Sequence, residues 1–257
     1  IRICRVFLIL ADKVSQKLFV DKIISCPETY LAEVGVNNPS LIKYINKKAK
    51  IKYIGFEPNP VNYKRYNLHE YGVINKAVTI NQNKPLDFYV PIFNNQLSNI
   101  LPESGKGSLI SGRHNVKEIK VKVECIKLDE ILRNFNVNAW WIDAEGLSIK
   151  MLSKILRRND QPNFIYTESE KNDKELIRKI ITENKDKYII IRARTSHNQD
   201  NYIFLDKTLV KNGIPIYFVI FKLRLYEILF LILFSNFKML AKLKKIILKN
   251  LPKFPIK

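Results

Sequence analysis

Short apolar runs alternate with segments of helical periodicity from residue 29 to residue 206, and this pattern limits the folds that the chain can adopt. The apolar runs have the length of strands, and most are apolar throughout, as is typical of strands covered on both faces. We predict strands at 29–35, 51–56, 73–80, 139–143, 164–168, 188–193 and 201–206, and helices at 39–48, 60–70, 128–135, 147–158 and 173–184. This order predicts an α/β fold with a mostly parallel sheet and helices on both faces.

One part of this region departs from the alternation. Residues 85–91 and 118–128 alternate apolar and polar side chains, and a polar stretch over 94–115 separates them. Such a pattern is typical of antiparallel strands with one solvated face. We therefore expect an antiparallel or edge insertion here.

Length and charge suggest how the chain is divided. A chain of 257 residues suits one globular domain with an appendage. Its formal charge is +20, and the segment from Lys211 onward contributes ten basic residues and one acid. We expect a helical or extended lead-in over 1–28, an α/β domain over 29–210, and an apolar and basic helical tail over 211–257.

The tail suggests attachment to a surface. Residues 214–234 are mostly apolar but include Lys222, Arg224 and Glu227, and 237–250 reads as a basic amphipathic helix. Charges in the middle of a span are costly, so we expect the tail to lie on an anionic membrane surface rather than cross it. The alternative is a helical appendage that packs on the domain or on a partner subunit.

The spacing of the cysteines and the first residues of the sequence indicate the cellular compartment. Cys4, Cys26 and Cys125 lie far apart, without the spacing of a disulfide framework or a zinc site. The opening residues, IRICRVFLILAD, lack a small-residue cleavage pattern, so no secretory signal is expected. We expect a cytoplasmic protein, held peripherally at the membrane by its tail.

The first candidate site is the turn after the first predicted strand. It contains Glu33, Gly35, Asn37 and Pro39. In nucleotide-binding α/β folds this turn uses glycine so that the backbone can approach the ligand. A single glycine is a weak signal, and an ordinary strand-to-helix turn explains it about as well.

The second candidate is the segment Glu57-Pro58-Asn59, at the end of the second predicted strand. A carboxylate at this position can accept hydrogen bonds from both hydroxyls of a ribose. The alternative is a solvated acid at a strand end.

The third candidate is the stretch WWIDAEG, in which Asp143 and Glu145 follow a buried strand and precede Gly146. In open parallel sheets, ligands bind at the carboxyl ends of the strands. The alternative is that Asp143 caps the next helix and Glu145 complements its dipole. Both roles are compatible.

Taken in order, the motifs EVGVN, FEPNP, NKAV, LDEIL, WIDAEG and YTE resemble the FkbM-type methyltransferases over about residues 29–205. The resemblance implies a Rossmann-like seven-stranded methyltransferase sheet and S-adenosyl-L-methionine as cofactor. It implies that the turn containing Glu33, Gly35 and Asn37 contacts the cofactor, and that Glu57, with Pro58 and Asn59, binds its ribose.

The resemblance also implies an acceptor side. Asp143 and Glu145 match the family's acidic pair near the reaction centre, and either could remove the proton from an acceptor hydroxyl. His114, in the long polar loop, is an alternative base. Ser98 and Asn99 in the same insertion, and Glu168 at a later strand end, are candidate substrate contacts. No metal is required by the sequence.

The implied function is O-methylation of a hydroxyl on a sugar, glycan or polyketide-like metabolite. The alternative is a diverged member, catalytically weak or inactive, attached to a membrane surface or an anionic partner. It rests on departures from the family pattern, such as Glu33 in place of Asp, Pro39 in place of a second glycine, and Leu147 and Ser148 after Gly146.

A basic chain would also suit a nucleic-acid-binding protein. Here, however, many basic residues mix with apolar ones in the tail, and no DPPY-like motif is present. We therefore expect no nucleic-acid partner.

Overall fold

The computed structural model describes residues 2–91, 118–144, 146–195 and 199–210, together with 221, 223–225 and 228. Four predicted site residues lie outside the described residues: Ser98, Asn99, His114 and Glu145. The polar stretch over 94–115 and most of the predicted tail over 211–257 also lie outside them.

The fold is built on a seven-stranded sheet with the strand order β10-β11-β9-β8-β1-β2-β3. Its strands are β1 (Tyr30–Val34), β2 (Lys52–Phe56), β3 (Val73–Ile74), β8 (Ala139–Ile142), β9 (Phe164–Glu170), β10 (Tyr188–Arg194) and β11 (Gln199–Asp206). β11 is antiparallel to both of its neighbours, and all other neighbouring pairs are parallel. The predicted mostly parallel, Rossmann-like sheet is confirmed.

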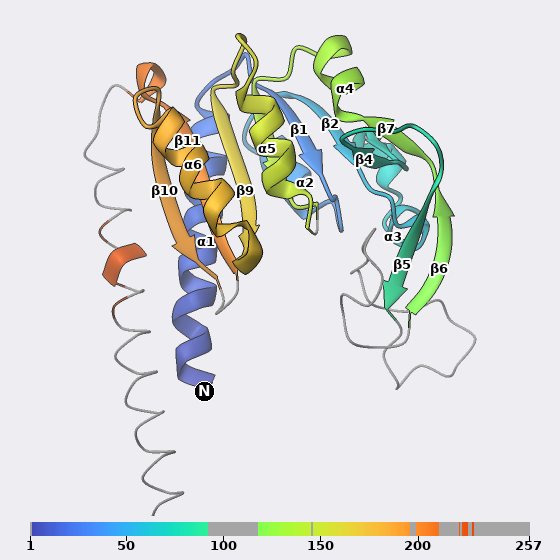
Figure 1. Cartoon of the computed structure of the whole chain (residues 1–257), viewed down its shortest axis with the longest axis horizontal. Helices are drawn as coiled ribbons and strands as arrows, with labels where there is room; N and C mark the ends of the chain where they lie inside the picture. Colours follow the sequence, from blue (N-terminus) through green and yellow to red (C-terminus); the bar gives the residue numbers. More distant parts are fainter. Residues whose placement is uncertain are drawn as a thin grey trace, which may run out of the picture.

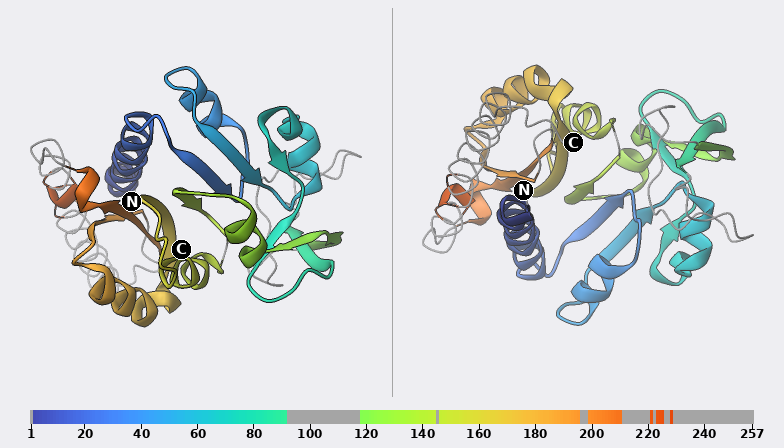
Figure 2. Two further views of the ribbon diagram at one scale, coloured as in Figure 1. Left: turned by 90° about the horizontal axis from the view of Figure 1, so that it is seen from above. Right: turned by 90° about the horizontal axis from the view of Figure 1, so that it is seen from below.

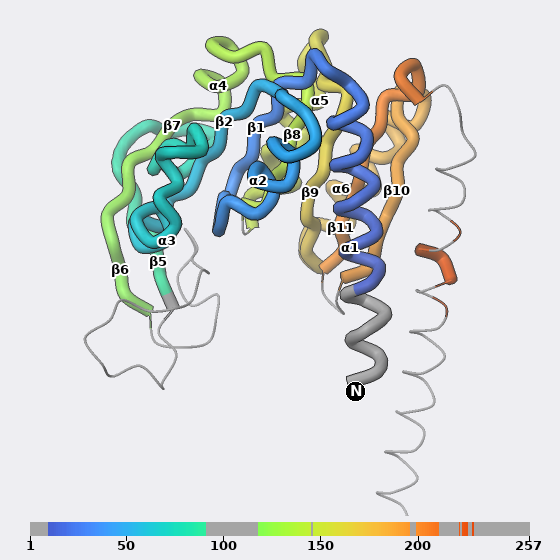
Figure 3. Tube along the Cα trace, turned by 180° about the vertical axis from the view of Figure 1, so that it is seen from behind, coloured from blue at the N-terminus to red at the C-terminus, as the bar shows by residue number. Residues whose placement is uncertain are grey.

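Helices cover both faces of this sheet (Figures 1 and 2). They are α1 (Arg2–Ile24), α2 (Ser40–Asn46), α3 (Pro60–Arg65), α4 (Leu128–Asn134), α5 (Ser148–Leu156) and α6 (Lys174–Asn184), with 3₁₀ helices η1 (Leu68–Tyr71), η2 (Lys171–Asp173) and η3 (Lys207–Leu209). Figure 1 shows α5 and α6 over one face, and Figure 3, from behind, shows α1 and α2 over the other.

Each helical layer buries an apolar stripe against the sheet. In α5, Met151, Leu152 and Ile155 recur at helical spacing and are almost completely buried in the cluster that contains Trp140. The opposite cluster joins α1 and α2 to the other face of the same strands. The alternation along β8, with Trp140 on one face and Trp141 on the other, follows from the two-residue period of a strand.

Helix α1 is joined to the sheet by both rings and polar groups. The ring of Phe19 lies edge-on to the rings of Trp141 and Tyr166, at centroid distances of 5.7 and 5.8 Å. Asp12 Oδ1 accepts hydrogen bonds from the Tyr166 hydroxyl at 3.1 Å and from Asn201 Nδ2 at 2.7 Å. The predicted lead-in over 1–28 is therefore largely a helix that shares a core with the sheet.

The predicted strand over 73–80 is divided in two. β3 pairs with β2, whereas β4 (Ala77–Thr79) leaves the large sheet and pairs with β7 (Cys125–Lys127). The predicted insertion contains an antiparallel pair, β5 (Leu86–Pro91) and β6 (Glu118–Val123), which lies beyond the β3 end of the large sheet (Figure 1).

One helix boundary differs from the sequence prediction, and the structure also gives the last strand its place in the sheet. The helix predicted over 60–70 ends at Arg65, and Asn67, with a left-handed φ of 48°, precedes η1. The last strand, β11, does not extend the sheet but inserts between β9 and β10. Residues 201–206 of β11 are buried, which suits an inner position better than an edge.

No helix within the described residues is both long and apolar enough to cross a membrane.

Candidate functional site

Four predicted site residues occupy one row at the carboxyl end of neighbouring parallel strands. The residues in register there, across β2, β1, β8 and β9, are Phe56, Val34, Ile142 and Thr167. The next residue along each strand direction is Glu57, Gly35, Asp143 and Glu168, respectively. The strand register thus brings these four positions together at one end of the sheet.

This row crosses the point where the strand order reverses. From β1 the chain continues outward to β2 and β3, whereas β8 starts the other half, followed in the chain by β9. In open α/β sheets, ligands bind outside the carboxyl ends of the strands at such a reversal. Gly35 and Asp143 are the residues that follow the two strands on either side of it.

The turn at Gly35 packs closely against the backbone of Asp143. Gly35 has a φ of +86°, and a Cβ atom there would lie 2.1 Å from the backbone oxygen of Asp143. The Asp143 amide in turn donates to the Val34 carbonyl at 2.9 Å. Glycine is required at this position both for its positive φ and for the close approach of the two backbones.

The amide groups of this turn are already used within the protein. Gly35 N and Val36 N both donate to the Phe56 carbonyl, at 2.9 and 3.2 Å, and Asn37 N donates to the Gly35 carbonyl at 2.9 Å. Pro39 has a φ of −80°, an ordinary value for proline, and stands at the N-cap of α2. The departure from a second glycine is therefore accommodated without backbone strain at Pro39.

The segment after β2 holds Glu57 rigidly. Glu57 is buried, and its Oε1 accepts from the Asn59 amide at 2.7 Å. The Asn75 side chain donates to the carbonyls of Glu57 and Pro58, at 2.7 and 3.3 Å. Burial raises the pKa of Glu57 well above its usual value, and the nearby carboxyls of Asp143 and Glu33 add to the increase.

Asn59 has one donor left over. Its Oδ1 accepts from the Val61 amide at 3.0 Å and caps α3, but its Nδ2 is buried without a hydrogen-bond partner among the described residues. An unpaired buried donor is costly. Its place beside Glu57 is consistent with a site that a polar ligand completes.

Glu33 is a buried acid on the β1 strand, and its partner was not predicted from the sequence. The Tyr53 hydroxyl on β2 donates to Glu33 Oε2 at 2.7 Å. Burial raises the pKa of Glu33 to about 8, with a further contribution from the Asp143 carboxyl, while the Tyr53 hydrogen bond opposes the increase. Glu33 is therefore mostly protonated at neutral pH.

A cleft of about 530 Å³ opens beside this turn, a volume in the usual range for small-molecule sites. Its lining comes from α1, α2 and the carboxyl ends of β1 and β8, and consists of Lys13, Gln16, Lys17, Val20, Glu33, Gly35, Asn37, Asn38, Ser40, Leu41, Tyr44, Trp141 and Asp143. The cleft thus contains two of the three predicted sites. Glu57, Pro58 and Asn59 are not among its lining residues.

The cleft residues from α1 were missed because the sequence suggested only a lead-in there. The one available signal was the i, i+3, i+4 spacing of Lys13, Gln16 and Lys17, which places them on one face of a helix. Tyr53 was missed because nothing local indicates that its hydroxyl reaches Glu33. Gly55, two residues later, leaves the space that this hydroxyl occupies, since a Cβ there would lie 2.6 Å from it.

The capping alternative for Asp143 does not hold. The N-cap residue of α5 is Leu147, and no side chain makes a capping hydrogen bond there. Ser148 Oγ instead accepts from the Ala144 amide at 2.9 Å, which closes the turn locally. Asp143 therefore lines the cleft without serving as the cap of α5.

Glu168 was predicted to end its strand, but β9 continues to Glu170 because its pairing with β11 extends to Gln199. Its Oε1 accepts from Gln199 Nε2 at 2.6 Å. Glu168 shares the row with Asp143 but is not a lining residue of the 530 Å³ cleft.

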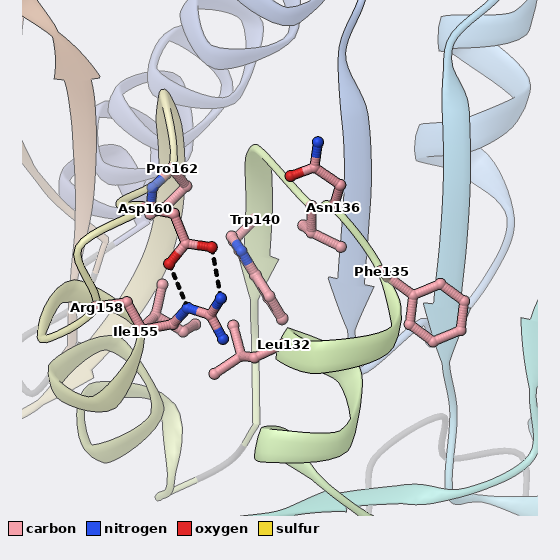
Figure 4. Close-up of a pocket in the computed structure, with 9 residues that line it drawn as sticks. Leu132, Phe135, Asn136, Trp140, Ile155, Arg158, Asp160 and Pro162 are labelled. Atoms are coloured by element: carbon pink, nitrogen blue, oxygen red, sulfur yellow. Dashed lines mark hydrogen bonds and ion pairs between the residues drawn. The ribbon is translucent and has the colours of Figure 1, made fainter.

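A separate, very small cavity lies toward the amino end of β8 (Figure 4). Leu132, Trp140 and Ile155 line it together with Arg158 and Asp160, which form a two-point ion pair at 2.6 and 2.5 Å. Its volume of about 10 Å³ is that of roughly one water molecule. It is therefore no alternative to the cleft as a site for a nucleoside.

Among solved structures, the chain is similar to TrmK of M. capricolum, determined in complex with the cofactor product S-adenosyl-homocysteine. The identity is 13%, the match covers 73% of this chain and 67% of that one, and the TM-score is 0.36. None of the curated proteins compared with the chain matches it.

The family model of the FkbM methyltransferase domain matches residues 33–188, more than half of the chain. The match includes Glu33, Gly35, Glu57 and Asp143, and it ends at the first residue of β10. The cofactor that goes with this family is S-adenosyl-L-methionine. On this match, and with a seven-stranded Rossmann-like sheet whose cleft lies at the strand-order reversal, the chain belongs to the FkbM methyltransferase family.

Proposed function

We propose that the protein is an S-adenosylmethionine-dependent O-methyltransferase that acts on a hydroxyl of a sugar, a glycan or a polyketide-like metabolite. The observation that carries this proposal is the row of Glu57, Gly35 and Asp143 at the strand-order reversal. It combines a candidate ribose ligand, a close backbone turn and a candidate base within one end of the sheet.

The residues present fit the adenosyl group. Glu57 and the unpaired Nδ2 of Asn59 supply an acceptor and a donor at the end of β2. Asn37, which is exposed beside the Gly35 turn, lines the cleft. When bound, S-adenosylmethionine supplies an electrophilic methyl group on a sulfonium centre.

The chain's own part in the reaction is to orient the acceptor and remove its proton. The carboxylate of Asp143 lines the cleft, where it can accept a hydrogen bond from an acceptor hydroxyl and then its proton. Gly35 fixes the backbone of Asp143 by contact, so the direction of this carboxylate depends on a rigid part of the fold. Glu145 remains the second candidate base, with His114 as a further alternative.

The proposal is tested by measuring S-adenosylhomocysteine affinity and methyl transfer in Asp143→Asn and Glu145→Gln. We expect both variants to bind S-adenosylhomocysteine as the wild type does, and Asp143→Asn to lose transfer by about 10²-fold or more. Wild-type turnover in Asp143→Asn with loss in Glu145→Gln would assign the base to Glu145. Wild-type turnover in both would remove this acidic pair from the mechanism.

We also propose that residues 213–257 hold the protein peripherally at an anionic membrane surface. The support is the charge of the sequence, since basic residues interspersed with apolar ones favour the interface of anionic lipid. In this proposal the catalytic domain acts from the cytoplasmic side.

A further inference from the structure

The wall that α1 contributes to the cleft is basic. Lys13 and Lys17 lie one helical turn apart on the same face of α1, with Gln16 between them, and all three line the cleft that Asp143 also lines. The candidate base, Asp143, therefore shares one cavity with a pair of lysines.

Neither lysine is committed to a strong internal partner. Among the described residues, Lys13 makes no ion pair. Lys17 Nζ lies 2.5 Å from Asp21 Oδ2, but the two side chains are 67% and 49% exposed. An exposed pair of this kind contributes little to stability, so a ligand can displace Asp21 at small cost.

Two lysines at i and i+4 repel each other on the free helix, and the attraction of both to an anion bound between them offsets this repulsion. Asp12, the acid next to Lys13 in the sequence, does not neutralise the two lysines. Asp12 is turned toward the sheet, where Tyr166 and Asn201 donate to it. The cleft therefore presents its positive charge to whatever enters it.

The rest of the lining suits the body of a small hydroxylated ligand. Trp141, Tyr44 and Leu41 supply apolar surface, and Ser40 and Asn38 add polar groups. An aromatic surface with a few polar groups is a usual lining for a small-molecule site.

Building on the proposed O-methyl transfer, we propose that the acceptor is a hydroxylated anion, a sugar or related metabolite that carries a carboxylate or a phosphate. Lys13 and Lys17 bind its anionic group, and the hydroxyl to be methylated faces Asp143. In the transfer, the acceptor oxygen forms a bond to the methyl carbon, the sulfur–methyl bond breaks, and the hydroxyl proton passes to the carboxylate. S-adenosylhomocysteine leaves as the second product.

The test is a binding measurement on the full chain saturated with S-adenosylhomocysteine. The protein has two tryptophans, and Trp141 lines the cleft, so the fluorescence of a Trp140→Phe variant reports from the cleft alone. Calorimetry on the chain with both tryptophans provides the same titrations if Trp140→Phe folds poorly. The probes are glucose 6-phosphate, glucuronate and glucose.

We expect the better of the two anionic probes to bind at least about tenfold more tightly than glucose, which also shows whether the site prefers phosphate or carboxylate. The double variant Lys13→Gln/Lys17→Gln should lose this preference, whereas Lys22→Gln, in the last turn of α1 and outside the cleft, should keep it. Equal binding of all three probes, or an unchanged preference in the double variant, would overturn the proposal.

The same titrations separate this inference from the proposed function. If the double variant binds S-adenosylhomocysteine more weakly and the anion preference is unchanged, the lysines serve the carboxylate of the methyl donor, and only the present inference fails. If instead the anion preference is found but no hydroxyl acceptor is methylated, the anion site stands and the proposed transfer reaction fails.

Discussion

The absent side chain of Gly35 is what allows the backbone of Asp143 to lie where it does. A Cβ at Gly35 would fall 2.1 Å from the Asp143 carbonyl oxygen, well inside van der Waals contact. The two residues are more than 100 positions apart in the chain, yet the turn after β1 and the turn after β8 are fitted to each other at this point. The candidate cofactor turn and the candidate base are therefore one structural unit.

Gly35→Ala should damage both parts of this unit. The positive φ and the clash together should lower the free energy of unfolding by at least about 2 kcal/mol, and the displaced Asp143 should reduce methyl transfer. Urea denaturation and a transfer assay measure the two effects. Gly72→Ala is the matched control, because Gly72 also has a positive φ, of +75°, but a Cβ there would meet its nearest neighbour, Tyr53 O, only at 3.7 Å. Equal effects of the two variants on transfer would show that the contact with Asp143 is unimportant.

Glu57→Gln should weaken binding of S-adenosylhomocysteine by about tenfold or more, since hydrogen bonds to a charged group contribute about 1.5–3 kcal/mol. Because burial raises the pKa of Glu57, and donated hydrogen bonds from ribose hydroxyls favour its ionised form, affinity in the wild type should rise with pH. The rise should be absent in the variant. Calorimetric titration at several pH values measures this, with the exposed Glu124→Gln as the control. An unchanged affinity would rule out Glu57 as the ribose ligand.

Glu33→Gln should change how stability depends on pH. The pKa of Glu33 is about 8 in the folded protein, above the ordinary value of 4.5, so between these values the folded state holds a proton that the unfolded chain has released. The contribution of Glu33 to stability is complete below the lower value and is lost as the pH rises through about 8.

Thermal unfolding between pH 5 and 9 tests this. Glutamine cannot ionise but can still accept the hydrogen bond from Tyr53. The stability of Glu33→Gln relative to the wild type should therefore increase as the pH rises. If the difference in melting temperature between the two proteins does not vary with pH, the buried carboxyl is already ionised at neutral pH.

Removal of residues 213–257 should abolish co-sedimentation with vesicles of anionic lipid, because these residues combine nine basic side chains and one acid with many apolar ones. The affinity for S-adenosylhomocysteine should be unchanged. Vesicles of neutral lipid are the control for the charge effect. A truncated protein that still sediments with anionic vesicles would show that the attachment lies elsewhere.

The sequence alone was sufficient for the type of sheet and for which end of it carries the candidate site residues. The apolar runs before Glu57 and Asp143 predict buried parallel strands, and parallel strands finish at the same end of a sheet. Their acids therefore had to meet there, and the register of β2, β1 and β8 confirms that they do. These are consequences of local pattern and chain direction, which a sequence contains explicitly.

Tertiary structure decided the features that depend on contacts between distant segments. No periodic pattern in the sequence indicates the contact of Gly35 with Asp143 or the hydrogen bond from Tyr53 to Glu33. The same is true of the position of Lys13 in the cleft. The position of β11 is of the same kind, since hydrophobicity predicts that a strand is buried but not between which neighbours it lies. Local sequence determines which residues form strands and helices, whereas packing in three dimensions determines which of their side chains share a cleft.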